Sequence, residues 1–120
     1  MADERQSKLE VPEIYANSAQ DIQLREIGQT FHQLLSPLNT VEQIILFMEE
    51  GYVNIWTVTD HLSGEEADAI YRRELDLHRE FPGEKLHFRL IQLRGRPLRH
   101  FLTPQEGHLV IKLSEVNSSA

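Results

Sequence analysis

One stretch of this sequence combines two strand patterns with a helix pattern between them. Residues 53–59 and 86–93 are rich in β-branched, aromatic and aliphatic side chains, which favour strands. Residues 64–81 between them carry a helical pattern, and Ser63 and Glu66 have the spacing of a capping box at its start. A helical crossover of this length brings the second strand back parallel to the first through a right-handed connection. The stretch therefore predicts a parallel strand–helix–strand unit at the centre of the fold.

Two helices are expected before this unit. The first runs from residue 21 to residue 35, where Ser36-Pro37 ends it. The second covers residues 39–50, and Gly51 suits its C-cap. This second helix is apolar over much of its girth, so we expect it to be buried on more than one side or to meet a second subunit. The apolar positions are Leu24, Ile27, Phe31, Leu34 and Leu35 in the first helix, and Val41, Ile44, Ile45, Leu46, Phe47 and Met48 in the second.

The fold class predicted from this order is α+β. Two N-terminal helices precede a strand, a helix and two further strands, of which the last covers residues 108–113. These elements would form a small sheet of ferredoxin-like or half-ferredoxin character. One face of the sheet would be covered by the crossover helix, and the other face also needs cover. A two-fold homodimer is the simplest way to complete so small a sheet.

The length of 120 residues indicates one domain. We expect an extended or partly disordered arm over residues 1–20, a single α+β domain over residues 21–113 and a frayed tail over residues 114–120. The longest apolar run has five residues, 44–48, far short of the roughly 20 that cross a bilayer, and the polar start does not resemble a signal peptide. The sequence thus favours a cytoplasmic protein with no membrane contact.

Charge and cysteine content narrow the possible functions. The net charge of -7 argues against broad binding to nucleic acid or to a membrane surface. The absence of cysteine removes disulfides, thiolate metal sites and cysteine nucleophiles. The glycines show no phosphate-loop, dinucleotide-binding or nucleophile-elbow spacing. No cofactor and no metal are therefore expected.

The middle of the chain resembles a group of small uncharacterised bacterial α/β proteins. The resemblance covers roughly residues 52–100, where a tryptophan-bearing strand, an acidic helix ending in Phe-Pro and a second strand follow one another. It implies no activity and no functional residues. The residues that carry it are Ile55-Trp56-Thr57-Val58, Ile70-Tyr71, Glu74-Leu75, Phe81-Pro82, Phe88 and Leu90-Ile91.

The predicted crossover helix carries a polar pair on its apolar stripe. On a helical wheel Glu74 and His78, at i and i+4, fall near the centre of that stripe, with Tyr71 beside them. Burying either charged group alone is costly, so an internal hydrogen bond is one interpretation. A dimer interface or ligand cleft at Glu74, His78 and Tyr71 is the second. A metal or acid–base site is the third, for which His61 and His87 are the only recruits.

A basic segment follows the second predicted strand. Residues 85–105 hold five cations and no acid, so this segment is +5 and the remaining 99 residues sum to -12. Arg94, Arg96 and Arg99 lie around a turn, and arginine suits phosphate and carboxylate groups. Either these arginines pair with the acidic helix or an acidic partner subunit, or they bind an anionic ligand or a nucleic-acid phosphate, or they are simply solvated.

Three functions are compatible with these patterns. The first is a small non-enzymatic, dimeric interaction or regulatory module, indicated by the absent catalytic motifs, the very apolar segment 39–50 and the segregated charge. The second is an anion- or nucleotide-binding module that uses Arg94, Arg96 and Arg99. The third is a metal-dependent or acid–base enzyme that uses Glu74 and His78. Expected partners are a second copy of the chain, an acidic protein or a phosphate-bearing ligand.

Overall fold

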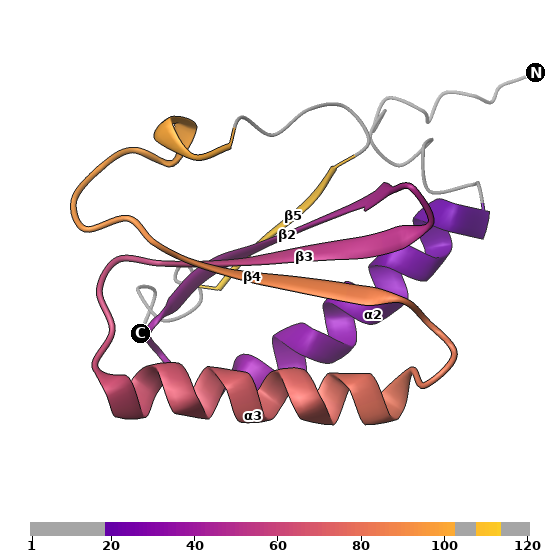
Figure 1. Ribbon diagram of the computed structural model, residues 1–120, viewed down its shortest axis with the longest axis horizontal. Coiled ribbons are helices and arrows are strands. Elements are labelled where there is room, and N and C mark those ends of the chain that lie inside the picture. The colour runs from indigo at the N-terminus through magenta and orange to yellow at the C-terminus, as the bar shows by residue number, and fades with distance from the viewer. Residues whose placement is uncertain (1–18, 103–107, 114–120) are drawn as a thin grey trace, which may run out of the picture.

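The computed structural model describes residues 19–102 and 108–113, which form a mixed sheet with two α-helices (Figure 1). Of the arm expected over residues 1–20, residues 1–18 lie outside the described residues and Ala19 and Gln20 belong to α2; the tail over residues 114–120 also lies outside them. The sheet has four strands in the order β4-β3-β2-β5, and this arrangement confirms the α+β class. The elements are α2 (Ala19–Leu35), β2 (Val41–Glu49), β3 (Tyr52–Thr59), α3 (Gly64–Glu80), β4 (Leu86–Gln92), the short 3-10 helix η3 (Leu98–His100) and β5 (Leu109–Lys112).

The parallel strand–helix–strand unit is present as predicted. β3 and β4 pair in parallel from Val53 opposite Leu86 to Thr59 opposite Gln92, and α3 connects them. The start of α3 is fixed by Ser63, whose side chain accepts a hydrogen bond from the Glu66 amide while the Glu66 carboxylate accepts one from the Ser63 amide. Together these two bonds satisfy backbone donors that a helix start leaves free.

The helix expected over residues 39–50 is wrong, because this segment is strand β2. Its side chains alternate between the two faces of the sheet: Ile44 and Leu46 are fully buried on the helix side, and Ile45 is fully buried on the other. β2 lies between β3 and β5, and a central strand covered on both faces is apolar all round. That pattern resembles the pattern of a helix buried on several sides. The chain thus has one N-terminal helix among its described residues, not two.

A tight hairpin turn takes the place of the helix C-cap expected at Gly51. Glu49 pairs with Tyr52, so only Glu50 and Gly51 connect β2 to β3. Both have positive φ, 55° and 84° respectively. Two consecutive residues in this region are characteristic of the hairpin turn that matches the right-handed twist of the strands, and glycine adopts it without strain.

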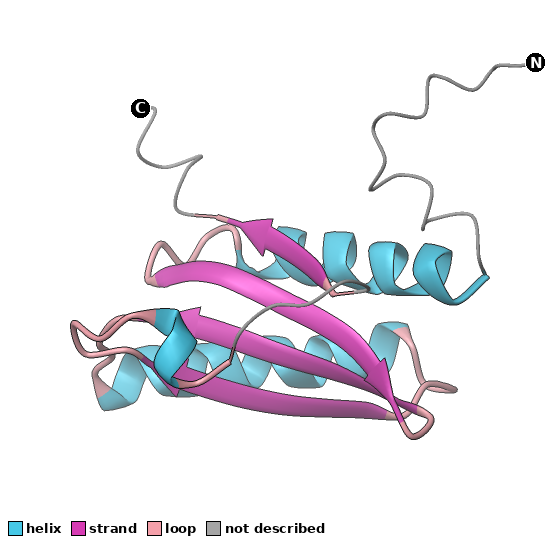
Figure 2. Ribbon diagram, turned by 90° about the horizontal axis from the view of Figure 1, so that it is seen from above, coloured by secondary structure: helices cyan, strands magenta, loops and turns pink. Residues whose placement is uncertain are grey.

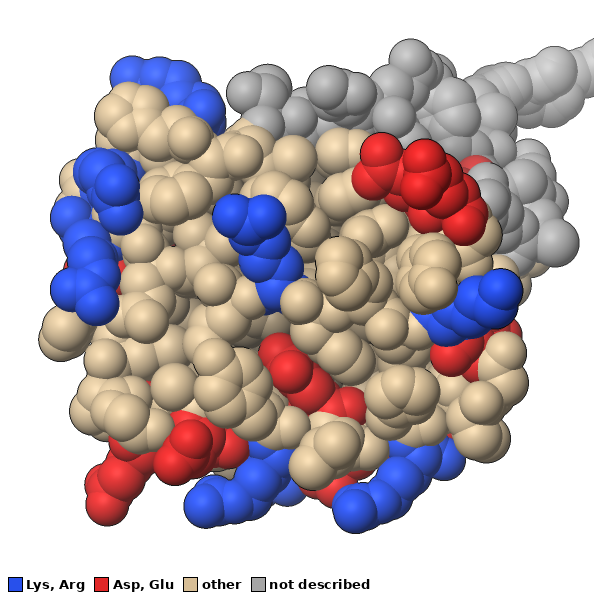
Figure 3. Space-filling view, in the orientation of Figure 1, with Lys and Arg blue, Asp and Glu red and all other residues tan. Residues whose placement is uncertain are grey.

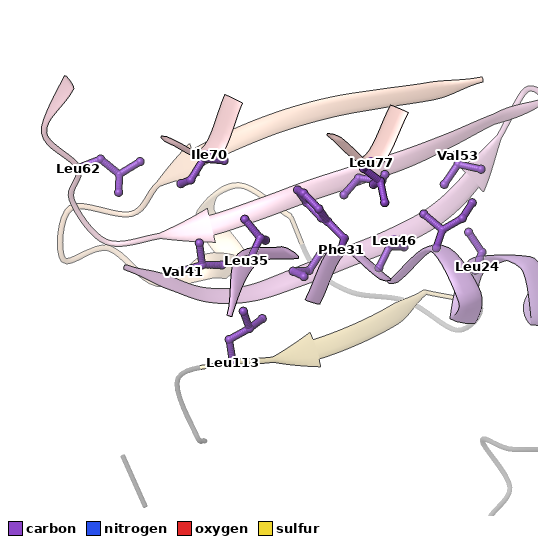
Figure 4. Packing of buried hydrophobic residues seen from close by; sticks show 13 residues of the cluster. Leu24, Phe31, Leu35, Val41, Leu46, Val53, Leu62, Ile70, Leu77 and Leu113 are labelled. Atoms are coloured by element: carbon purple, nitrogen blue, oxygen red, sulfur yellow. The ribbon is translucent and has the colours of Figure 1, made fainter. Parts of the chain in front are cut away.

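Both helices pack on the same face of the sheet (Figures 1 and 2). The main core fills the space between them and the strands, with Phe31 from α2, Leu46 from β2 and Leu77 from α3 among its fully buried members (Figure 4). Gly28 lets α2 approach closely, because a Cβ atom there would lie 2.8 Å from Ile111 Cδ1 and 3.1 Å from Leu46 Cδ1. The main core therefore lies on one side of the sheet, and among the described residues no α-helix covers the opposite face.

The assignment of β2 to the core can be tested by truncating one side chain on its helix-facing side. We expect Ile44→Ala, at a fully buried position, to lower the free energy of unfolding by about 2–5 kcal/mol, because it removes buried methyl groups and leaves a cavity. The matched control is Ile22→Ala, on α2 at a position that is 54% exposed, which should change it by less than about 0.5 kcal/mol. Urea unfolding measures both, and equal losses would contradict the burial described here.

Candidate functional site

The face of the sheet that bears no α-helix carries a second apolar cluster. Across the sheet Val110, Ile45, Trp56 and Arg89 form one row, because each is paired in register with the next. We call this surface the open face, and Figure 2 looks onto it with both α-helices behind the strands. It is formed by Ile45 and Phe47 of β2, Trp56 and Val58 of β3, Arg89 and Ile91 of β4, and Val110 of β5.

One end of the open face is covered by the segment that follows β4. Leu98 of η3, together with Phe101 and Leu102, packs against the buried cluster formed by Ile45, Val58, Ile91 and Leu93. At the other end the cover among the described residues is limited to single side chains, with His108 stacked on Phe47 and Arg89 over Trp56. There Phe47 and Trp56 are only half-buried, and their rings lie 6.2 Å apart. Partly covered aromatic rings on central strands are characteristic of a contact surface.

The turn after β4 is fixed at the end of the sheet by hydrogen bonds to Asp60. The Arg94 amide donates to the Asp60 carbonyl oxygen, and the Gly95 amide donates to Asp60 Oδ1, each at 2.8 Å. Arg94 and Gly95 both have positive φ, 52° and 82°. These two hydrogen bonds fix the turn that leads from β4 to η3 at this end of the sheet.

Arg94, Arg96 and Arg99 form what we call the basic end, and all three side chains are exposed. Arg96 is partly held, because its Nε donates to the Leu93 carbonyl oxygen at 2.9 Å and its guanidinium lies 4.8 Å from the centre of the Phe101 ring. None of the three forms an ion pair with a described residue. The expected pairing with α3 is therefore not seen there, and the ion pairs of α3 are internal, from Arg73 and from Arg79 to Asp76 at 3.1 Å each.

The opposite end of the open face has a hollow of about 440 Å³, lined by Glu49, Glu50, Tyr52, Asn54 and His87. We call it the acidic hollow, because both glutamates are exposed at its margin. His87 Nδ1 and Asn54 Oδ1 are hydrogen-bonded at 3.1 Å, and the Tyr52 ring is 46% exposed. The hollow therefore combines the negative charge of two glutamates with the Tyr52 ring and the polar groups of Asn54 and His87.

His108 lies near the acidic hollow and stacks on Phe47 with ring centroids 4.5 Å apart. Burial lowers the pKa of this imidazole, and the nearby Glu49 carboxylate opposes that shift. Neutral imidazole is therefore favoured on this part of the face.

Opposite charges therefore mark the two ends of one surface. In Figure 3 Lys and Arg side chains gather over η3 and the turn after β4, and Asp and Glu side chains lie over the end of the β2–β3 hairpin. Between them Arg89 lies over the Trp56 ring, 4.8 Å from its centre. Lys85 is at the hairpin end, 5.8 Å from the Tyr52 ring, so the acidic hollow is bordered by one cation.

Of the polar pair predicted on α3, Glu74 is half-buried and His78 is exposed. Burial raises the pKa of the Glu74 carboxyl to about 7, and its Oε2 atom is buried without a hydrogen-bond partner. His78 is exposed and Tyr71 is 49% exposed, so the inward orientation expected of these two is not seen. The buried face of α3 is centred nearer Ile70 and Leu77, a rotation of about 70° on the wheel at 100° per residue.

The reason for this rotation is the position of the neighbouring elements. Glu66 and Ala69 of α3 line a hollow with residues 37–40, which follow α2, so that side of α3 faces the first helix. The side that bears Tyr71 and His78 faces away from it. Over the part of the chain that the structure describes, no group of three or more His, Asp or Glu side chains is placed to hold a metal ion, and no helix is long and apolar enough to span a membrane.

The sequence does not reveal the open face, because the apolar run over residues 39–50 predicts a helix there. Once they are a strand, the alternation of Ile45 and Phe47 with Ile44 and Leu46 indicates a sheet that is apolar on both faces. Comparison of the chain with protein families, curated proteins and solved structures finds no match. The open face is therefore identified as the candidate functional site from its geometry alone.

The half-buried Glu74 generates a prediction about pH. Below pH 4.5 the carboxyl is neutral in the folded and unfolded chains alike; as pH rises from 4.5 to about 7, only the unfolded chain ionises, so stability is lost. Above about pH 7 both forms are charged and the loss is constant. The quantity to compare is the free energy of unfolding of Glu74→Gln minus that of the unmodified chain. Because Glu74 is partly in contact with water, we expect this difference to be about 1–2 kcal/mol larger at pH 8 than at pH 5.

Urea unfolding at the two pH values measures this difference. The control is Glu80→Gln, an exposed glutamate on the same helix, which should shift stability equally at both. If Glu74→Gln retains the pH dependence of the unmodified protein, the assigned environment of Glu74 is wrong.

Proposed function

We propose that this protein is a small non-enzymatic interaction module that binds a protein partner through the open face of its sheet. The observation that carries the proposal is the end of that face where, among the described residues, Phe47 and Trp56 remain only half-buried on the two central strands. Removing such apolar surface from water supplies binding free energy, at roughly 25 cal/mol per Å² before the costs of association.

The polar surroundings of this patch support specific recognition. Arginine and aromatic side chains are enriched at protein interfaces, and here Arg89 lies directly over Trp56. The basic end and the acidic hollow flank the patch with opposite charges, which would fix the orientation of a partner.

Photo-crosslinking from the open face tests this proposal. We expect benzoylphenylalanine in place of Phe47 to form a covalent protein adduct when cells expressing the variant are irradiated, because the ring would lie against the partner. The same group in place of Tyr71, which is 49% exposed on α3, is the matched control and should give at least tenfold less adduct. Equal yields at the two positions, or no adduct from position 47, would refute binding through the open face.

A second candidate function is supported by the basic end. Arg94 and Arg99 are exposed and form no ion pair with any described side chain, so their charges are available to a phosphate-bearing ligand. We expect pyrophosphate, used as the probe, to raise the melting temperature of the protein, and Arg94→Ala with Arg99→Ala to abolish that rise. An unchanged melting temperature at millimolar pyrophosphate would exclude this candidate.

A further inference from the structure

We infer that the partner of the open face is a second copy of this chain, seated so that the basic end of each copy enters the acidic hollow of the other. This inference rests on the proposed function, since it names the occupant of the same surface. It is carried by three matches between the two ends of the open face, in position, in shape and in charge.

The first match is one of position. β3 begins at the acidic hollow, with Tyr52, and ends beside the basic end, where the Leu93 and Arg94 amides donate to the carbonyl oxygens of Thr59 and Asp60. The two features therefore lie at opposite ends of the same strands. A two-fold axis that lies between two facing sheets and runs across their strands exchanges these ends. It places each basic end over the partner's acidic hollow, as an isologous interface requires.

The second match is one of shape. η3 and its flanking segment stand out from one half of the open face (Figure 1). The other half contains a hollow of about 440 Å³. Two such surfaces cannot pack with their raised halves together. The two-fold arrangement described above instead sets the raised half of each copy against the hollow half of the other.

The third match is one of charge. Arg94 and Arg99 are exposed at the raised half, and Glu49 and Glu50 are exposed at the hollow. An axis running along the strands would bring arginines against arginines, so charge selects the axis across them. Arg89 lies on the edge strand β4, at the rim of the interface, where a charge stays hydrated and has little effect on affinity.

The area available also requires the raised segment to take part. The four strands have 9, 8, 7 and 4 residues, an average of seven. At about 4.8 Å between strands and about 3.3 Å per residue they give a flat face of about 440 Å². Stable interfaces bury about 800 Å² on each partner. The sides of η3 and the walls of the acidic hollow would supply the remainder, so contact between the flat strands alone is not sufficient.

The test exchanges the charges at the two ends. One variant carries Glu49→Lys and Glu50→Lys; the other carries Arg94→Glu and Arg99→Glu, leaving the internally bonded Arg96 intact. Each variant alone would oppose like charges at both contacts, so we expect the dissociation constant of its dimer to rise at least tenfold. Mixed in equal amounts, the two variants pair lysine with glutamate at one contact and arginine with glutamate at the other. The mixture should therefore dimerise like the unmodified chain.

Sedimentation velocity over a range of protein concentrations reads out all four samples. The control variant, Arg72→Glu with Arg79→Glu, reverses two exposed charges on α3 and should leave dimerisation unchanged. Recovery of the dimer in the mixture also shows that both variants are folded. A monomeric unmodified chain, or a mixture that stays monomeric while each variant retains a cooperative melting transition, overturns the inference.

Failure of this inference is distinguishable from failure of the proposed function. A crosslinked adduct from position 47 of a mass other than twice that of the chain would mean that the open face binds a different protein. In that case the self-association inferred here is wrong and the interaction module stands.

Discussion

The arrangement of this protein depends on a sheet whose central strands are apolar on both faces but whose two α-helices cover only one. Leu46 points into the helix-covered core, and its neighbours Ile45 and Phe47 point to the other side. Water contact with an apolar face is unfavourable, and the chain reduces it by folding η3 and its flanks over one half. In the other half, Phe47 and Trp56 remain only half-buried among the described residues.

The charged side chains also differ between the two halves of the open face, with arginines at the half that η3 covers and glutamates at the other. The arginines of the basic end do not neutralise the acidic helix α3, which instead pairs Arg73 and Arg79 with its own Asp76. They lie at one end of the sheet, in and after a turn that Asp60 fixes through the Gly95 amide. Glu74 is a separate feature: its carboxyl sits on the helix side, and its raised pKa reflects burial without a partner. Glu74 makes the stability of the fold depend on pH, whereas the open face is the surface proposed for binding.

Sequence patterns predicted the centre of the fold and failed at its periphery for physical reasons. The unit from Val53 to Gln92 was predictable because a capped helix between two β-branched strands has few alternative arrangements. β2 was not, since a short apolar run buried on both faces has the same composition as a buried helix. Only the turn residues Glu50 and Gly51 distinguish the two, and a glycine after glutamates also suits a helix end. The orientation of Tyr71 and His78 depended on where α2 lies, which the pattern of α3 alone does not contain. The basic segment was visible as a charge asymmetry, but its position over the open face required the fold.

The central claim is that a second copy covers the open face, and the single tryptophan reports on it directly. Trp56 lies on that face, and the chain has no other tryptophan to obscure its signal. The decisive measurement is the quenching of Trp56 fluorescence by acrylamide as the protein is diluted from high micromolar to nanomolar concentration. The account predicts weak quenching in concentrated protein and a several-fold increase in the quenching constant on dilution, as the copies separate. A quenching constant that is the same at every concentration, in a protein that stays folded, would contradict it.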